Sequence, residues 1–460
     1  MIARARNGPR RASRAAASAM SNCRSPPSNG WRWRWPPTAR APDRGSSAPE
    51  ARPRPSMIRG SRAPPIPRAG CGSRSSSSAF MPCATSLRPR SAARSGSAWA
   101  STPRMETDMA TRRHVLAGLI ASAMPRPSWA DAGSPAFLSA ARLPSGAFAL
   151  FGLTEAGTPV FTIPLPARGH AAAAHPTRAE AVAFARRPGP YALVIACASG
   201  TLRARLTPPE GRQFNGHGAY SADGAVLYTS EVVAESSAGI VGLWDTTGWH
   251  RLGEFSSGGV GPHELRRLPG SELLVVANGG IRTDPQDRSR LNLGTMRPNL
   301  SYLSPDGALL EQAELPEELR QNSIRHLALA GDGTVAFAMQ WEGDPAEPVP
   351  LLGLHRRGEA LRLCPPREED LFAMRGYAGS IARSGGLIAL TSPRGGVVQL
   401  FTAEGAPVAG HARPDACGVA PVAGGFVVTD GGGAVTRLTR EGFAPLARAA
   451  AAWDNHLVRI

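Results

Sequence analysis

The segment Gly216–Glu231 reads GHGAYSADGAVLYTSE, and it decides the fold because its pattern returns along most of the chain. An apolar alternation enters a turn at Asp223 and Gly224 and leaves through the strand-like residues Ala225–Tyr228, which is typical of a β-hairpin. His217 stands seven residues before the turn glycine. The segment therefore provides a spacing that can be searched for elsewhere.

The same seven-residue offset recurs between other histidines and turn residues. The pairs are His263 with Gly270, His326 with Gly333 and, in weaker form, His170 with Thr177. Two further copies, near Gly379 and at Cys417-Gly418, lack the histidine, and His456 marks a last one. These positions lie 38 to 63 residues apart, about four strands each, so the sequence predicts an all-β chain folded as a seven-bladed β-propeller.

The last repeat is incomplete, since only His456–Ile460 follow its histidine. The run Phe137–Pro164 contains three strand-like segments and no histidine of this kind. We therefore expect the propeller to be closed by pairing of the C-terminal strand with N-terminal strands, His456–Ile460 lying beside Phe137–Arg142. Such closure leaves no exposed edge strand between the first and last blades.

Charge separates the first 104 residues from the rest of the chain. Residues 1–104 hold 20 Arg and 2 acidic residues, whereas the remainder holds 32 Arg and 33 acidic residues. The basic average therefore does not indicate nucleic-acid binding. Residues 1–104 are rich in Arg, Pro and Ser, and we expect them to be disordered or a spurious extension upstream of a true start at Met105 or Met109.

Residues 105–130 resemble a twin-arginine export signal. Arg112 and Arg113 precede a short apolar run, and small residues at Ser128 and Ala130 suit cleavage. The apolar run is too short to span a bilayer, and we expect no membrane span in the mature chain. Residues 131–460 would then form the propeller, located in the periplasm and monomeric.

Nine short motifs along residues 131–460 resemble a family of bacterial exported proteins catalogued as domain of unknown function 1513. The motifs are GHGAYSADGAVLYTSE, GVGPHEL, LVVANGGI, LNLGTMRPNLSYL, SIRHLA, GYAGSIA, TSPRGG, DACGVA and WDNHL. The resemblance implies a seven-bladed periplasmic propeller of unassigned activity, often encoded near iron-uptake proteins of the imelysin type.

Equivalent positions in radially repeated blades face one axis, so five histidines should ring one mouth of the channel. They are His170, His217, His263, His326 and His456. Neutral imidazole suits iron, copper or zinc, and three or four ring neighbours, namely His170, His217, His263 and as a fourth His456, would hold one ion. The alternatives are that the histidines cap loops or bond backbone, or that they line a site for an organic ligand. Further residues expected near this mouth are Glu231, Asn278, Gln340, Arg394, Cys417 and Asp430.

The long interval after His263 contains an insertion, ANGGIRTDPQDRSRLNLGTMRPNL, predicted to overhang the histidine-lined mouth. Arg282, Arg290 and Arg297 would be available there for an anion. Three functions remain open: a metal-binding or partner-binding propeller, for example in iron acquisition; a metal-dependent hydrolase of the lactonase type or a metal-centred redox enzyme; and a scaffold whose channel binds nothing.

Overall fold

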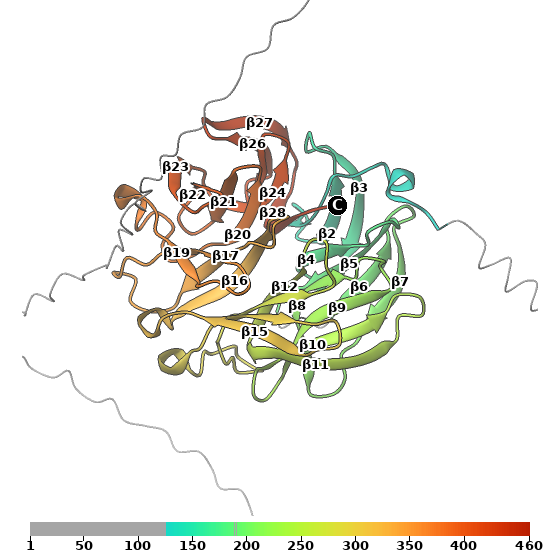
Figure 1. The fold of residues 1–460 in the computed structure, drawn as a ribbon. Coiled ribbons are helices and arrows are strands. Elements are labelled where there is room, and N and C mark those ends of the chain that lie inside the picture. The colour runs from blue at the N-terminus through green and yellow to red at the C-terminus, as the bar shows by residue number, and fades with distance from the viewer. Residues whose placement is uncertain (1–125, 188, 190) are drawn as a thin grey trace, which may run out of the picture. The chain divides into compact units, whose positions relative to one another are not determined.

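The computed structural model describes residues 126–460 except Pro188 and Pro190. The predictions for residues 1–104 and for residues 105–125 of the export signal lie outside this range. The described chain forms seven four-stranded antiparallel sheets and four short 3-10 helices, and no α-helix occurs within it. The predicted seven-bladed β-propeller is therefore confirmed (Figure 1). None of the helices described reaches the length and apolar character that crossing a membrane requires.

Each blade is a sheet whose four strands succeed one another from the axis outward. Blade 1 contains β28 (Ala452–Arg459), β1 (Phe137–Arg142), β2 (Phe148–Leu153) and β3 (Pro159–Leu165). Blade 2 contains β4 (Gly169–Ala174), β5 (Glu180–Ala185), β6 (Ala192–Ala196) and β7 (Thr201–Leu206). Blade 3 contains β8 (Arg212–Tyr220), β9 (Val226–Val233), β10 (Ala238–Asp245) and β11 (Arg251–Val260). Blade 4 contains β12 (Pro262–Arg267), β13 (Leu274–Asn278), β14 (Asn299–Leu303) and β15 (Leu309–Glu314).

The remaining blades follow the same order. Blade 5 contains β16 (Asn322–Leu329), β17 (Val335–Trp341), β18 (Leu352–His355) and β19 (Arg362–Cys364). Blade 6 contains β20 (Ser380–Ser384), β21 (Leu387–Ser392), β22 (Val397–Thr402) and β23 (Pro407–Ala412). Blade 7 contains β24 (Ala416–Val422), β25 (Gly425–Asp430), β26 (Ala434–Thr439) and β27 (Gly442–Arg448). The 3-10 helices are η1 (Trp129–Ala132), η2 (Leu293–Thr295), η3 (Glu317–Leu319) and η4 (Glu368–Asp370).

The middle strands of the blades are apolar on both faces because each sheet is covered by a neighbour on either side. β6, with the sequence ALVIA, is buried at every position, and so are β13 and β14. The outer strands β7 and β15 are mostly exposed, and each has one buried residue. The core therefore consists of apolar layers between blades, and it leaves the axis to the inner strands.

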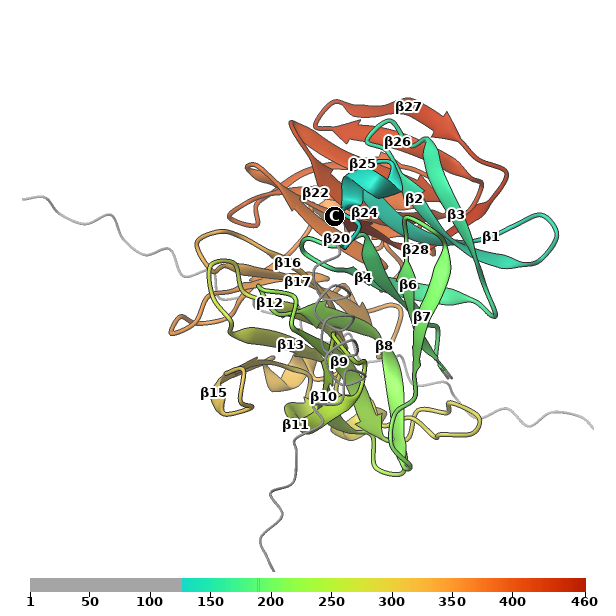
Figure 2. The same ribbon diagram turned by 90° about the vertical axis from the view of Figure 1, so that its right-hand side faces the viewer.

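The ring closes between the two ends of the described chain. β28 pairs antiparallel with β1, from Phe137 opposite Arg459 to Arg142 opposite Ala452, and Figure 2 shows the two strands side by side. Trp453 also packs edge-on against Phe151 of β2, with ring centroids 5.1 Å apart. The predicted closure is confirmed, and the C-terminal strand is longer than expected because it begins at Ala452.

Candidate metal centre

Five inner strands break their pairing register at the position of a histidine. The register shifts lie between Gly169 and Ala172, Phe214 and Gly218, Pro262 and Leu265, Ile324 and His326, and Trp453 and Leu457. A β-bulge leaves a residue unpaired and re-aims its side chain. His170, His217, His263 and His456 lie within such bulges, whereas His326 pairs with Ala338 and follows the unpaired Arg325. The bulges explain how the first four leave the ordinary alternation of a strand and turn toward the axis.

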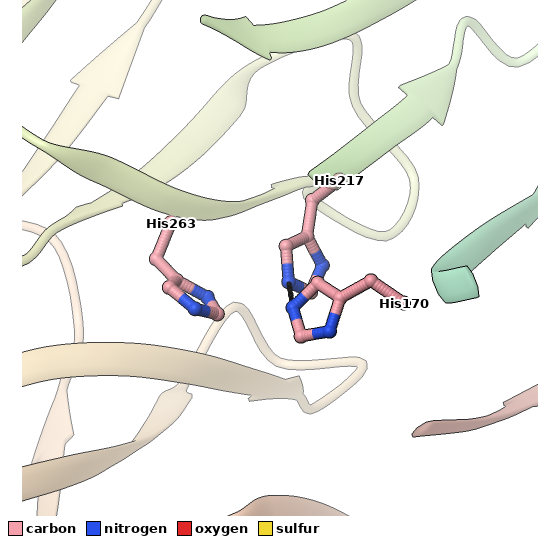
Figure 3. Close-up of side chains that lie close together, drawn as sticks. All are labelled: His170, His217 and His263. Carbon is pink, nitrogen blue, oxygen red and sulfur yellow. Dashed lines mark hydrogen bonds between the residues drawn. The ribbon is translucent and has the colours of Figure 1, made fainter. Parts of the chain in front are cut away.

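The five imidazoles form one contiguous cluster rather than a spaced ring. The shortest distance between ring centroids is 4.5 Å, between His170 and His456. His263 lies 4.7 Å from both His217 and His326, and His326 lies 4.8 Å from His456. His217 lies 4.9 Å from both His170 and His456. The Nε2 atoms of His170 and His217 are 3.2 Å apart (Figure 3). The predicted convergence is therefore tighter than the sequence indicated, since rings on non-adjacent blades also meet.

Gly216 makes room for this packing. It adopts a φ of 93°, which side-chain-bearing residues rarely adopt, and a Cβ added there would lie 2.7 Å from Cδ2 of His170. The residue before His217 must therefore be small for the ring of His170 to reach its neighbours. This explains the Gly-His pair in the segment that begins at Gly216.

Burial keeps four of the five imidazoles neutral near pH 7. It lowers the pKa of His170, His217 and His263 well below the ordinary value, and the neighbouring imidazoles and arginines lower it further. Burial, followed by the charge of His326, lowers the pKa of His456 to about 3. Neutral imidazoles keep a free lone pair, so these four histidines have the protonation state that metal binding requires.

Several ring nitrogens in the cluster are buried without a hydrogen-bond partner among the described residues. They are Nδ1 of His170, His263 and His326 and Nε2 of His456. A buried polar atom without a partner costs about 1–3 kcal/mol. Four such atoms in one cluster argue against the alternative that these histidines serve only as hydrogen-bonding caps.

The arrangement fits a transition metal in two overlapping places. His170, His217 and His263 form one group, and His217, His326 and His456 form another, with the candidate ligand atoms of each group within 4.8 Å of one another. Tetrahedral coordination with metal–nitrogen bonds of about 2.0–2.1 Å places ligand nitrogens roughly 3.3 Å apart. The pair His170–His217 already has this spacing. His217 is the ligand common to both groups.

Glu264 lies beside the second group. Its Oε2 is 3.4 Å from Nδ1 of His326, a contact without proper hydrogen-bond alignment, and accepts a hydrogen bond from the Leu327 amide at 3.1 Å. Burial would raise the pKa of this carboxyl, but His326 and Arg266 outweigh it and hold the pKa below its ordinary value. Glu264 is therefore an anionic neighbour of a candidate ligand. The sequence did not indicate this role, because adjacent histidine and glutamate residues such as His263 and Glu264 are common.

A cavity of about 130 Å³ reaches the cluster along the inner strands. Its lining includes His326, His456 and Glu264 together with Ser380 of β20 and Val419 of β24. Larger hollows of about 330 and 450 Å³ are lined mainly by outer strands and connecting loops of blade 2 and of blades 1 and 7. The inner-strand cavity thus lies against two of the candidate ligands, His326 and His456.

Glu231 is directed away from the axis, which corrects its expected place at the mouth. Both carboxylate oxygens bond Arg251 of the outer strand β11, at 2.9 and 3.0 Å, and Thr229 donates a further hydrogen bond at 2.6 Å. Gly242 leaves space for the carboxylate, because a Cβ there would lie 2.0 Å from Oε1. Glu231 therefore belongs to a buried ion pair inside blade 3.

Four other residues expected near the mouth have partners outside the cluster. Asn278 joins blades 3 and 4 through Ser257 and Asn299, and Gln340 donates to the Ala378 carbonyl at 3.1 Å. Asp430 caps a turn and pairs with Arg413, and Cys417 lies beside Asp415 with its thiol pKa raised by burial. None of these four contributes to the histidine groups. Cys197, Cys364 and Cys417 are free thiols.

Arg394, the remaining residue of that set, stacks on Tyr377, with its guanidinium carbon 4.2 Å from the ring centroid. Tyr377 in turn accepts a hydrogen bond at 3.3 Å from Asn455, the residue before His456. Within the described structure, Arg394 is therefore linked to the cluster only through Tyr377 and Asn455.

The insertion after β13 is held against blades 3 and 5. Thr283 exchanges hydrogen bonds with Ser237, and Arg290 pairs with Glu342 after β17. Arg297 pairs instead with Glu314, the last residue of the outer strand β15. Of the three arginines predicted to be available for an anion, Arg290 is the one that reaches across to blade 5. The sequence interpretation missed Arg325, which directly precedes His326.

With the fold and the cluster described, comparison with known proteins assigns the family. The chain belongs to the family described as "Protein of unknown function (DUF1513)", whose model matches residues 163–460. The resemblance stated from the sequence motifs is therefore confirmed. Comparison with curated proteins gives no match.

Solved structures resemble the chain at low identity. The chain is similar to Kuenenia stuttgartiensis hydrazine synthase (11% identity, 66% of this chain and 90% of that chain, TM-score 0.46). It is also similar to U3-55K (12% identity, 62% of this chain and 82% of that chain, TM-score 0.47). A third similar structure is the computationally designed Ika8 protein (12% identity, 68% of this chain and 91% of that chain, TM-score 0.44). Similarities at this level carry no statement about function.

Proposed function

We propose that this protein is an exported β-propeller that binds a first-row transition metal, iron, copper or zinc, in its axial histidine cluster. The observation that carries the proposal is the convergence of five buried imidazoles, four of which have a ring nitrogen without a partner among the described residues. Imidazole nitrogen is a common ligand for these metals, and a metal ion would satisfy those nitrogens together. His217, common to both groups, would be the central ligand.

Metal titration of the chelator-treated protein tests the proposal. His217→Asn should weaken binding of Zn²⁺, Cu²⁺ or Fe²⁺ by more than the roughly 10–100-fold typical of changes outside the ligand set. His263→Asn affects the first group alone, and His456→Asn affects the second alone. The stronger of these two effects identifies the group that holds the ion.

His250→Asn is the matched control, because the His250 side chain is 66% exposed and lies outside the cluster. It should bind metal like the wild type. Equal and negligible uptake by the wild type and all variants would refute the proposal and leave the histidines as loop caps.

The cellular location is a separate part of the proposal. The twin-arginine motif at Arg112-Arg113 supports export to the periplasm, with a mature chain that begins near Asp131. N-terminal sequencing of the protein from its native host checks this. Peptides recovered from Arg4–Arg90 in that host would contradict both the late start and the export signal.

Iron acquisition, with a periplasmic imelysin-type protein as partner, is the role we propose for such a site. The proposal is supported by the neighbouring iron-uptake genes that the family resemblance implies and by a histidine cluster suited to iron. Iron content of the protein purified from iron-replete and iron-starved cells tests it. A preparation that carries zinc or copper and no iron under both conditions would reject the iron role and keep the metal site.

A second candidate function, a metal-dependent hydrolase or redox enzyme, is favoured by the cavity that reaches His326, His456 and Glu264. A metal with a position open to that cavity would supply Lewis-acid or redox chemistry, and Glu264 would lie at hand to accept a proton. Binding of azide or cyanide to the metal-loaded protein, followed by spectroscopy, would distinguish an open position from a fully coordinated ion.

A further inference from the structure

Arg325 is an unusual residue for the inner strand of a propeller. Its side chain is 8% exposed, and its Nε has no hydrogen-bond partner among the described residues. The nearest carboxylate, Glu342, lies 3.8 Å away, beyond hydrogen-bond distance, and already pairs with Arg290. A guanidinium carries five donors, so Arg325 is both buried and undersatisfied.

Arg187, which follows β5, is in a similar position. It donates one hydrogen bond within the described residues, to the neutral amide oxygen of Asn215 at 3.4 Å. Burial lowers the pKa of Arg187 to about 9, and the nearby charges of Arg325 and Arg288 lower it further. The same cause, burial, lowers the pKa of Arg325 to about 10. Arg187 also lines one small cavity with Arg288 of the insertion, so these two guanidiniums lie close together.

The insertion after β13 adds two more arginines to this place. Arg288 lines a cavity of about 30 Å³ together with Arg187 and Asp284, and Arg290 shares Glu342 with Arg325. One carboxylate oxygen of Asp284 already accepts hydrogen bonds from the backbone amides of Gln286 and Asp287. Four arginines thus face two carboxylates, and the charge is incompletely compensated.

The arginine group borders the histidine cluster. Arg325 directly precedes His326 in β16, and its charge contributes to the low pKa of His263, while that of Arg187 contributes to the low pKa of His170 and His217. A buried charge is stable only when it is paired, and the planar guanidinium matches the two oxygens of a carboxylate or phosphate.

We propose that Arg187 and Arg325, with Arg288 and Arg290 of the insertion, bind a small oxyanion of the carboxylate or phosphate type beside the histidine cluster. The anion supplies the acceptors that Arg325 lacks and offsets the repulsion between the guanidiniums. This site goes beyond metal binding and does not depend on it. In a metal-loaded protein, an anion held here would lie next to the ion.

The test is calorimetric titration of the chelator-treated, metal-free protein with inorganic phosphate and, separately, with citrate, at constant ionic strength. We expect saturable binding of one equivalent of at least one of them. Arg325→Gln and Arg187→Gln should each weaken it by at least about tenfold, the effect of losing a hydrogen bond to a charged group. Arg325→Lys should restore part of the loss, since it keeps the charge without the paired donors.

Arg356→Gln is the control, because Arg356 is half exposed and pairs with Glu359 on an outer loop of the same blade. Tighter binding of citrate identifies a carboxylate ligand, and tighter binding of phosphate identifies a phosphate ligand. Absence of saturable binding by the wild type, or unchanged binding by both Gln variants, would overturn the proposal. If Arg325→Gln fails to fold, Arg187→Gln decides alone. Because no metal is present, a failed metal titration leaves this result intact.

Discussion

The inner strands of blades 1–5 and those of blades 6 and 7 occupy equivalent places in the ring but present different side chains to the axis. β28, β4, β8, β12 and β16 each carry a histidine at or within a bulge. β24 is also bulged but has Cys417 and Gly418 there, and β20 keeps a regular register after Gly379. The cluster is therefore one-sided, and the inner-strand cavity is lined by His326 and His456 together with residues of β20 and β24.

This difference shows that the blade repeat determines where the inner-strand positions lie, whereas local packing determines which side chain fits at each of them. A Cβ on Gly418 would lie 2.6 Å from the amide nitrogen of Leu457, so β24 passes too close to β28 for a larger residue. On the blade 7 side, the close approach of β24 to β28 therefore leaves no space for a histidine at Gly418.

Removal of one histidine-bearing strand gives the largest expected effect. Deletion of Trp453–Ile460 should abolish cooperative unfolding, because blade 1 loses its inner strand and the edge of β1 becomes exposed. Circular dichroism during heating measures this. The point variant His456→Asn keeps the strand and should still melt cooperatively. A truncated protein that melts within a few degrees of the intact one would contradict the closure.

Acidification should act on the histidine side of the ring. In the metal-free protein the folded pKa of His456 is about 3, whereas an unfolded histidine titrates near 6.5. As the pH falls below 6.5, the unfolded chain takes up protons that the folded cluster does not, so stability is lost from there down toward pH 3. Each such histidine contributes up to about 1.4 kcal/mol per pH unit.

Thermal melts of the chelator-treated protein between pH 7 and pH 4 check this loss. His456→Asn should flatten the dependence, and His250→Asn at the surface should leave it steep. A melting temperature independent of pH in this window would mean that the folded cluster takes up protons as readily as the unfolded chain.

A substitution on the histidine-free side should test the packing explanation. Gly418→Ala should cost about 1–3 kcal/mol, typical of overpacking, because the new methyl group meets the backbone of His456 and Leu457. Gly386→Ala, in the turn before β21, is the control, since a Cβ there meets nothing within 4 Å. Urea denaturation measures both. Equal stability of the two variants would show that close packing does not explain the missing histidine.

The smallest expected effect concerns Glu264. If His326 is a metal ligand, Glu264→Gln should weaken metal binding by about tenfold, the lower end of the range for residues that orient ligands. Glu311→Gln provides a matched control, because Glu311 lies 3.4 Å from His355, a histidine outside the cluster. A loss of affinity as large as that of His217→Asn would place Glu264 among the ligands themselves.

The blade count, the closing strand pair and the five histidines could be predicted because they depend on spacing along the chain. The orientation of Glu231 could not, since alternation in a strand defines two faces and leaves open which neighbour each face meets. The space left by Gly242 in the adjacent strand was the available signal. The bulges were also missed, and they bring the histidines into mutual contact. Arg325 was overlooked, although an arginine inside the apolar stretch SIRHLA is a signal in itself.

The closing pair β1–β28 also sets an order of events during synthesis. Strands β1, β2 and β3 leave the ribosome well before β28, so blade 1 waits as three strands with an open inner edge while blades 2 to 7 are made. His456 lies on the strand that arrives last. Pairing of β28 with β1 closes the ring of blades and places His456, the fifth imidazole, in the cluster. A molecule with a complete cluster has therefore finished folding.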